Sequence, residues 1–396
     1  MSAAEARARM IAHLGLSRPL GRGRRGAQTL LERLRCIQLD PLDVIGTNAD
    51  LVVMARVDGI RRGELWRWLF PRASHTGRRT SARTNLAFEH FAKERCILPA
   101  AAFPWYRVQG HKAQAPWWRH GEREQRVPKQ LIAAVLAEVS ERGPVSAREL
   151  TDHGTVDPID WSGWKGTAKA TSMALEILWT RCDIVVAGRA GDGSKLYDIP
   201  QRSLGLGALA VPAGDFGRWA IRERAQAAGL LSRSGGSTWS MLSDVRTSRV
   251  PDEMIESGDL VEVMLEGSSR RYLAVPSFLD RPRVRHDDRV RILGPLDPLL
   301  WDRTLVHQIF DFEYVWEVYK PAHLRKWGWY VCPLLQRDRL IGRVDARIER
   351  SALVVRRLWV ESAIDPALIR TALEQHASAC GCGVVRMPKK SVVMRA

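Results

Sequence analysis

Residues 175–200 read LEILWTRCDIVVAGRAGDGSKLYDIP, and residues 252–276 read DEMIESGDLVEVMLEGSSRRYLAVP. Each stretch has an apolar pattern of helical period, a polar break at Asp183 or Asp259, a β-type run, a Gly-containing turn, and a second run that ends in Tyr shortly before Pro. The Asp and the Pro are 17 positions apart in both stretches. A helix that leads into a β-hairpin of this size is the ending of a winged-helix unit, so the chain is predicted to contain this unit twice.

Helical patterns precede both copies, as a winged-helix unit requires. A turn at Gly143-Pro144 separates the two patterns before the first copy. We therefore predict two tandem winged-helix domains, at residues 125–205 and 206–288. The four helical patterns are KQLIAAVLAEVSERG (129–143), VSARELTDHG (145–154), FGRWAIRERAQAAGL (216–230) and TWSMLSDV (238–245).

The two ends of the chain complete the predicted architecture. In the C-terminal domain, residues 289–396, short alternating strands between 329 and 361 precede one helix at Pro366 to His376, which indicates a small β domain. The predicted fold class is α+β: three tandem winged-helix domains followed by this β domain. The N-terminal domain, residues 1–120, supplies the third winged-helix unit from helical patterns at 5–16, 27–37, 62–70 and 85–98.

The charge balance favours a polyanionic partner. In 396 residues, 61 Lys and Arg oppose 44 Asp and Glu, a net charge of +17 that is spread along the chain. Proteins from GC-rich genomes carry such charge without touching nucleic acid, and winged helices also bind proteins, so neither feature decides alone. Together they predict double-stranded DNA as the partner, with no obligate protein partner.

The cysteines and the N-terminus exclude other classes. No pair of cysteines has CxxC spacing, and Cys380 with Cys382 near His376 lacks a second ligand pair, so we predict no metal and no cofactor. Residues 1–16 form an amphipathic Arg/Ala pattern without the apolar core of a signal peptide or a membrane span. We expect a cytoplasmic, nucleoid-associated protein that binds no membrane. The six cysteines, read as reduced core thiols, are Cys36, Cys96, Cys182, Cys332, Cys380 and Cys382.

The run CIQLDPLDVI at residues 36–45 carries polar groups inside an apolar segment. Pro41 disfavours helix at Asp40, so the chain is predicted to run extended from Ile37 to Pro41. Side chains alternate faces in an extended segment, which places Gln38 and Asp40 together on one side, roughly 6 to 7 Å apart at the backbone. Alternatively, Asp40 caps the turn before Pro41 and Gln38 bonds a backbone group.

Four runs of the sequence resemble the tandem winged-helix DNA glycosylases of the AlkZ/YcaQ type. They are CIQLDPLDVIGTNADLVVMARVDG (36–59), FEHFAKERCILPAAAFPW (88–105), GPLDPLLWDRTLVHQIFDFEYVWEVYKPAHLRKWGWYVCPLL (294–335) and IGRVDARIER (341–350).

This resemblance implies removal of N7-alkylated guanines, including crosslinked ones, by a Gln-apolar-Gln or Gln-apolar-Asp motif. Gln38 and Asp40 match its two polar positions, with Leu39 between them, and the Asp form resembles the YcaQ branch. Position 93 is Lys where the family has His, so no role is transferred to it.

The chemistry of such a lesion fits the two residues. Alkylation at N7 makes guanine cationic, so the base departs without an added proton, and the enzyme needs to stabilise an oxocarbenium-like sugar and deliver water. An ionised Asp40 suits both tasks, and Gln38 can orient the water. We therefore predict a monofunctional DNA glycosylase acting on alkylated duplex DNA in repair. The alternative is a non-enzymatic winged-helix transcriptional regulator, which has no need of the polar pair.

Seven residues are predicted to contact DNA. Lys165 and Lys169 open the predicted recognition helix of the middle domain beside a Trp pair, although a solvated face is the alternative there. The other five are Arg189 and Lys195, which flank the turn AGRAGDGSK, Asn48 and Arg56, which follow the motif, and Arg303, whose role is structural or functional.

Overall fold

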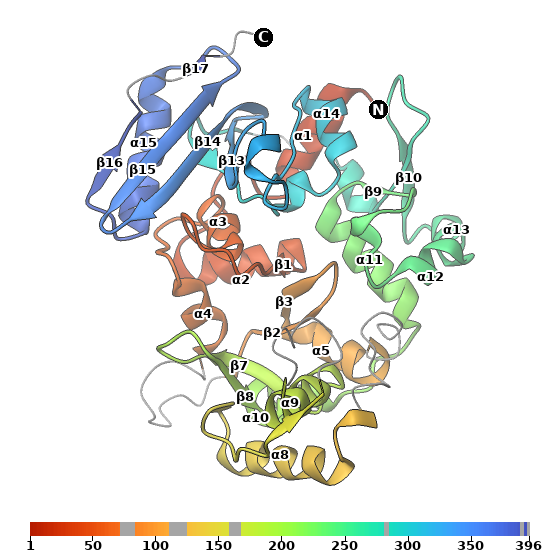
Figure 1. Cartoon of the computed structure of the whole chain (residues 1–396). Coiled ribbons are helices and arrows are strands. Elements are labelled where there is room, and N and C mark those ends of the chain that lie inside the picture. Colours follow the sequence, from red (N-terminus) through yellow and green to blue (C-terminus); the bar gives the residue numbers. More distant parts are fainter. Residues whose placement is uncertain (72–83, 111–124, 158–167, 281–284, 389–391, 394–396) are drawn as a thin grey trace. The chain divides into compact units, whose positions relative to one another are not determined.

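The computed structural model describes residues 1–71, 84–110, 125–157, 168–280, 285–388 and 392–393 (Figure 1). Its contacts divide the chain into two compact units, one made of Met1–Leu65 with Ala220–Ala396 and the other of Trp66–Trp219. Both units combine helices with small sheets, which confirms the predicted α+β class. No helix in the described ranges is both long and apolar enough to cross a membrane.

The N-terminal part of the first unit is helical and leads to the motif segment. Helix α2 ends because Arg35 adopts a left-handed conformation with φ 60°, after which the chain turns into the two-residue strand β1. Helix α3 begins at a capping box in which Thr47 and Asp50 bond each other's backbone N–H. The elements are α1 (Ala3–His13), α2 (Gly23–Leu34), β1 (Ile37–Gln38) and α3 (Asn48–Met54), and helix α4 (Glu64–Leu69) includes the boundary with the second unit.

Helix α11 begins a second group of helices and strands, at residues 216–274. Its three strands form one sheet in the order β10-β11-β9, and β10 pairs antiparallel with β11. The first short strand, β9, pairs with β11, the second strand of the hairpin. These elements are α11 (Phe216–Ala228), β9 (Leu231–Ser232), α12 (Ser243–Thr247), α13 (Val250–Glu256), β10 (Val261–Met264) and β11 (Arg271–Ala274).

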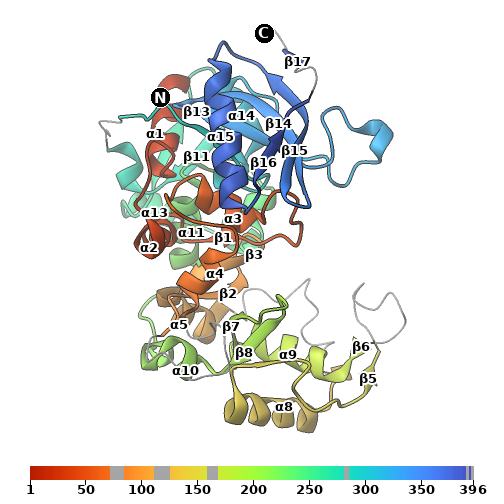
Figure 2. The ribbon, with the colours of Figure 1, turned by 90° about the vertical axis from the view of Figure 1, so that its left-hand side faces the viewer.

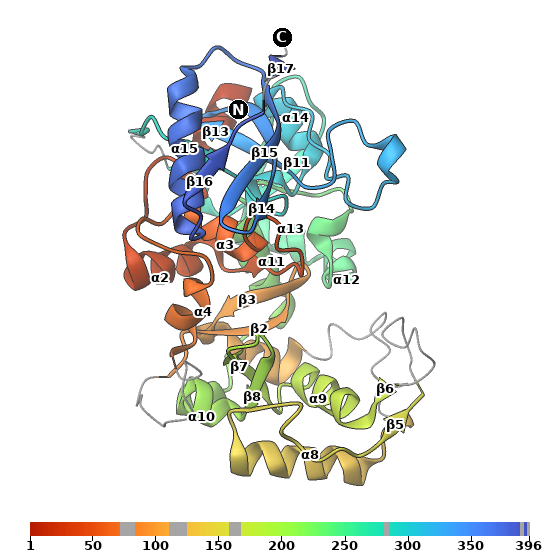
Figure 3. The ribbon, with the colours of Figure 1, turned by 60° about the vertical axis from the view of Figure 1, so that its left-hand side comes forward.

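The C-terminal part of the chain forms a larger sheet with a helix on one face. The sheet has the order β12-β13-β14-β15-β16, and β17 also pairs with β15 (Figure 3). Helix α15 packs on this sheet through Ile369, Leu373 and Ala377, in a core that also contains Ile45 and Leu51 from the N-terminal part. The elements are β12 (Val290–Ile292), α14 (Arg303–Phe310), β13 (Val331–Gln336), β14 (Arg339–Glu349), β15 (Ala352–Val360), α15 (Pro366–Ala379), β16 (Val384–Arg386) and β17 (Val392–Val393).

The second unit contains a three-stranded sheet, and two of its strands form a hairpin (Figure 2). The sheet has the order β4-β8-β7, so the first short strand again pairs with the second strand of the hairpin. Helices α8 and α9 pack against each other. The elements are β2 (Ala87–Phe91), β3 (Arg95–Pro99), α5 (Phe103–Trp105), α8 (Lys129–Arg142), β4 (Val145–Ser146), β5 (Thr155–Val156), β6 (Ala168–Lys169), α9 (Ala170–Thr180), β7 (Val185–Arg189), β8 (Lys195–Asp198) and α10 (Pro200–Leu204).

The helix predicted at residues 85–98 is wrong, because this segment is the β2–β3 hairpin. Every residue of β2 is buried, including the polar Glu89 and His90. A strand buried on both faces loses the alternation that marks a half-buried strand, and periodicity alone then cannot separate it from a buried helix.

The helix predicted at residues 145–154 is also wrong. Val145 and Ser146 form strand β4, and hydrogen-bonded turns follow. The Glu149 carboxylate accepts hydrogen bonds from the backbone N and the Oγ of Ser146, at 2.8 and 2.7 Å. This local start is of the capping type, but Asp152 and Gly154 form a separate turn that stops a helix from continuing.

Candidate active site

The predicted extended backbone is present at Ile37–Gln38, which form strand β1, and Asp40 follows two positions after the end of this strand. Gln38 is 7% exposed, whereas Asp40 is half-buried. Asp40 Oδ1 accepts a hydrogen bond from the backbone N of Leu42 at 2.9 Å, across Pro41. The capping role considered for Asp40 is therefore present, but it occupies one oxygen, and Oδ2 has no hydrogen bond to any other described residue.

The electrostatics of Asp40 follow from this half-buried position. Burial raises the pKa of the Asp40 carboxyl above its ordinary value, and the hydrogen bond from Leu42 partly opposes that change. A carboxylate whose pKa is raised is a better proton acceptor than an exposed Asp, provided that the pH keeps it ionised.

Asn48 holds the backbone of the motif at Gln38 through a hydrogen bond. Its Nδ2 donates to the backbone oxygen of Gln38 at 2.8 Å, and its Oδ1 accepts from the backbone N of Leu296 at 3.1 Å. The side chain is 1% exposed, and a Cβ at Gly294 would come within 2.6 Å of Oδ1. The prediction that Asn48 contacts DNA does not fit this burial, because one end of the amide bonds Gln38 and the other bonds Leu296.

Arg56 likewise has a structural role instead of the predicted DNA contact. Its guanidinium forms a two-pronged ion pair with Asp297, at 2.7 and 2.8 Å, and both side chains are fully buried. Its Nε also donates to the backbone oxygen of Leu14 at 2.6 Å. Breaking such a buried pair by removing one partner typically destabilises a protein by about 3–5 kcal/mol. The Arg56–Asp297 pair therefore joins the chain just after α3 to the segment that contains Leu296, the residue that bonds Asn48.

The C-terminal helix α15 holds the chain just beyond Asp40. His376 Nε2 lies 2.7 Å from the backbone oxygen of Ile45, and Cys380 Sγ lies 3.4 Å from the same oxygen. Burial lowers the pKa of His376, which keeps the imidazole neutral and able to donate to that carbonyl. Arg62 forms an ion pair with Asp43 from the same segment. Asp40 therefore lies on a loop that is fixed at several points.

Two of the predicted DNA-contacting residues are exposed. The Lys169 side chain is 70% exposed, with its Nζ 3.5 Å from Asp152 Oδ2. Arg303 is exposed at the start of α14, where Asp302 caps the helix. Lys165 lies outside the described residues.

Arg189 and Lys195, which flank the hairpin turn and were predicted to contact DNA, instead form ion pairs with carboxylates. Arg189 pairs with the buried Glu89, and its guanidinium lies 4.1 Å from the centre of the Trp66 ring. Lys195 Nζ lies 3.2 Å from Glu176 Oε1. Both cations compensate carboxylates of the same unit, because a buried carboxylate such as Glu89 requires a counter-charge.

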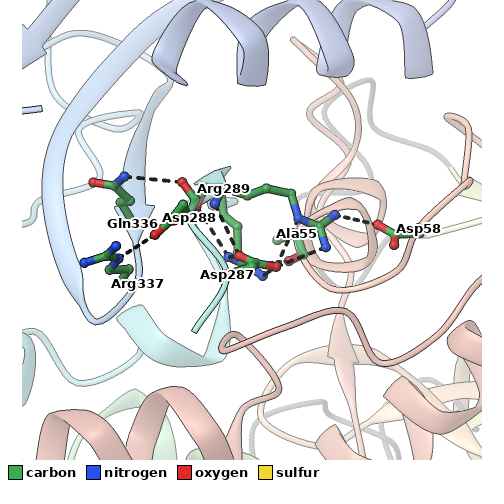
Figure 4. Close-up of polar contacts among 8 residues, drawn as sticks. Ala55, Asp58, Asp287, Asp288, Arg289, Gln336 and Arg337 are labelled. Carbon is green, nitrogen blue, oxygen red and sulfur yellow. Dashed lines mark hydrogen bonds and ion pairs between the residues drawn. The ribbon is translucent and has the colours of Figure 1, made fainter. Parts of the chain in front are cut away.

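A cavity of about 820 Å³ lies apart from the motif, lined by Met54 to Arg61, Arg289, Arg291 and the end of α15. Arg289 bonds Asp58 at 2.6 Å and also pairs with Asp287 (Figure 4). Arg291 bonds the same Asp287 at 2.7 Å. These charged side chains pair with one another. We therefore assign them a structural role, in which they join the chain after α3 to the C-terminal sheet. Gln38 and Asp40 do not line this cavity.

Sequence reasoning missed the residues that hold the motif from a distance. Asp297 is 241 positions from Arg56, and His376 is 331 positions from Ile45. No local signal marks either partner; only the runs around Asp297 that carry the family resemblance point to that segment. No group of three or more His, Cys, Asp or Glu side chains that could hold a metal occurs in the ranges the structure describes.

The chain is similar to proteins of known class over most of its length. The family model described as DNA glycosylase AlkZ-like matches residues 31–381. Among solved structures, the Streptomyces sahachiroi DNA glycosylase AlkZ matches with a TM-score of 0.59 and 16% identity, over 100% of each chain. Identity this low supports a shared fold and nothing finer, whereas the family match spans both polar positions of the motif.

Proposed function

This chain belongs to the AlkZ-like family of DNA glycosylases, and from that premise we propose that it hydrolyses the N-glycosidic bond of N7-alkylated purines in duplex DNA. Family membership itself supports DNA glycosylase activity in repair and does not favour the transcriptional regulator. The finer proposal is a monofunctional enzyme that uses neither metal nor cofactor and acts on monoadducts. Interstrand crosslinks are a second substrate to be tested.

The observation that carries the proposal is the fixed polar pair, Gln38 and Asp40. Asn48 bonds the backbone of Gln38, while His376 bonds the backbone of Ile45 beyond Asp40, so the backbone that carries the two side chains is held before substrate arrives. Preorganised groups stabilise a transition state without the cost of reorganisation. A regulator has no need for a half-buried carboxylate with an available oxygen.

The proposed reaction divides the work between the two side chains. The cationic base leaves with the electrons of the C1′–N9 bond and becomes neutral, so no general acid is needed. The Asp40 carboxylate faces the developing positive charge on the sugar and accepts the proton of the attacking water. The Gln38 amide orients that water.

We infer three winged-helix units from the element order. The described parts of 129–198 and 216–274 share the order helix, short strand, helix, hairpin, and the short strand pairs with the second hairpin strand; 129–198 also contains the β5–β6 strand pair before its second helix. Residues 23–99 follow the same order along the chain. The four-domain division at 1–120, 125–205, 206–288 and 289–396 stays a proposal, and Lys169 and Arg303 are the proposed phosphate contacts.

The test is excision from a synthetic duplex that contains one N7-methylguanine. The purified protein is incubated with labelled duplex in EDTA, and alkali then converts abasic sites to strand breaks. We expect a break at the lesion and none in the matched duplex with unmodified guanine. An intact lesion strand at high enzyme excess, with the protein folded and bound to the duplex, would refute the proposed substrate.

A further inference from the structure

Two buried hydrogen-bond donors beside the motif segment have no partner among the described residues. Tyr330, which directly precedes β13, is 2% exposed, and its hydroxyl makes no hydrogen bond there. The indole Nε1 of Trp316 is buried and unpaired in the same way. The two rings meet edge to face, with centroids 6.5 Å apart. Burying a polar group without a partner is unfavourable, so such a group calls for an explanation in function.

Tyr330 packs in the same hydrophobic cluster as the segment that follows Asp40. It belongs to the same hydrophobic cluster as Ile45, and Leu42 and Val44 pack against that cluster. These three residues follow Asp40 within five positions. Burial raises the pKa of Tyr330 far above its ordinary value, and the negative charge of Asp40 contributes to this. The hydroxyl therefore stays protonated and is available as a donor.

We propose that the Tyr330 hydroxyl donates a hydrogen bond to the attacking water and is a positioning residue of the active site. This inference rests on the proposed glycosylase function. The water then donates one hydrogen bond to the Asp40 carboxylate and the other to the Gln38 amide oxygen; only the proton shared with Asp40 is transferred, and the other stays on the new C1′ hydroxyl. Of its two lone pairs, one accepts from Tyr330 and the other attacks C1′.

The step balances with these groups alone. A bond forms between the water oxygen and C1′, and the C1′–N9 bond breaks with its electrons going to the cationic base. The released proton goes to Asp40. Tyr330 keeps its proton throughout, and Trp316 supports the orientation of its ring through the edge-to-face contact.

The decisive variant is Tyr330→Phe, which removes the hydroxyl and keeps the ring. Single-turnover excision of N7-methylguanine, the Kd for the duplex and the Tm are measured together. We expect excision to slow about tenfold, the scale of one lost hydrogen bond. The Kd stays unchanged, and the Tm is equal to or above that of the wild type, because an unpaired buried hydroxyl has been removed.

Tyr314→Phe is the matched control. Tyr314 is also buried in this region, but its hydroxyl donates to the backbone oxygen of Val331 at 3.4 Å. Its removal is expected to lower the Tm and leave the excision rate unchanged.

Two outcomes overturn the inference alone while the wild type excises the lesion. In one, Tyr330→Phe excises at the wild-type rate. In the other, its Tm falls together with the rate, which would show a structural hydroxyl. A wild-type protein that leaves N7-methylguanine in place overturns the proposed function, and this inference with it.

Discussion

Asp40 is the single residue whose protonation state governs the proposed chemistry. Its carboxyl is half-buried, and burial raises its pKa. The ionised form faces the sugar cation and accepts the water's proton, so the protonated form can do neither. The pH at which activity is lost therefore reports directly on this side chain.

We predict that excision slows as the pH falls through the raised pKa of Asp40. Because the pKa is raised, the loss begins at a higher pH than an exposed Asp with a pKa of about 3.9 would give. Single-turnover rates on the N7-methylguanine duplex between about pH 4 and pH 8 check this. A rate that rises on acidification, after subtraction of spontaneous depurination, would contradict the role of an ionised Asp40.

Local sequence predicted the motif geometry but not its support. Pro41 restricts the backbone of its immediate neighbour, and the strand found at Ile37–Gln38 agrees with the extended start of the segment that the residues predicted. The structural roles of Asn48 and Arg56 depend on their hydrogen bonds with Leu296 and Asp297, which are far away in the chain. The sequence around a polar residue near the motif does not show whether its side chain is buried and structural or exposed to DNA.

Among the secondary-structure elements, the hairpins separate two kinds of prediction. The β7–β8 and β10–β11 hairpins were predicted because a Gly-containing turn lies between two β-type runs. The β2–β3 hairpin was read as helix, since its turn at Ala92 to Glu94 contains no Gly or Pro and its strands are buried on both faces. Burial on both faces arises only in the folded molecule, so the hydrophobic periodicity of the sequence could not reveal this strand pair.

Helix α15 is predicted to support catalysis through His376. In His376→Leu the carbonyl of Ile45 loses its main donor, which costs about 1–3 kcal/mol of stability and loosens the loop that carries Asp40. His376→Gln is the matched control, because its amide nitrogen can replace Nε2. Thermal unfolding and single-turnover excision are measured on both. Wild-type stability and rate in His376→Leu would show that this bond does not position the loop.

At the scale of the whole molecule, the family match over residues 31–381 agrees with the resemblance seen in four separate runs of sequence. The α+β class and the C-terminal strands were predictable, because turn-bounded alternation is a local pattern. The direction of the basic side chains on the β7–β8 hairpin was not predictable, since Arg189 and Lys195 form ion pairs with Glu89 and Glu176.

The net charge of +17 leads to a prediction about DNA binding. The logarithm of the association constant is expected to fall with log salt, with a slope near −0.9 for each phosphate contacted. Lys169→Gln should reduce the slope by about one unit if it contacts one phosphate. Lys195→Gln is the control, because that lysine is paired with Glu176. A slope near zero for the wild-type chain would argue against a DNA-binding surface.

The central claim, that Gln38 and Asp40 carry out hydrolysis, is tested most directly by Asp40→Asn. This change keeps size and hydrogen bonding but removes the charge. With an N7-methylguanine duplex, we predict an unchanged Kd and an excision rate lowered by about 10² to 10⁴. Gln38→Ala should lose less, because water can partly fill the space. If Asp40→Asn, folded and bound to the duplex, excised the base at the wild-type rate, Asp40 would not be the catalytic carboxylate.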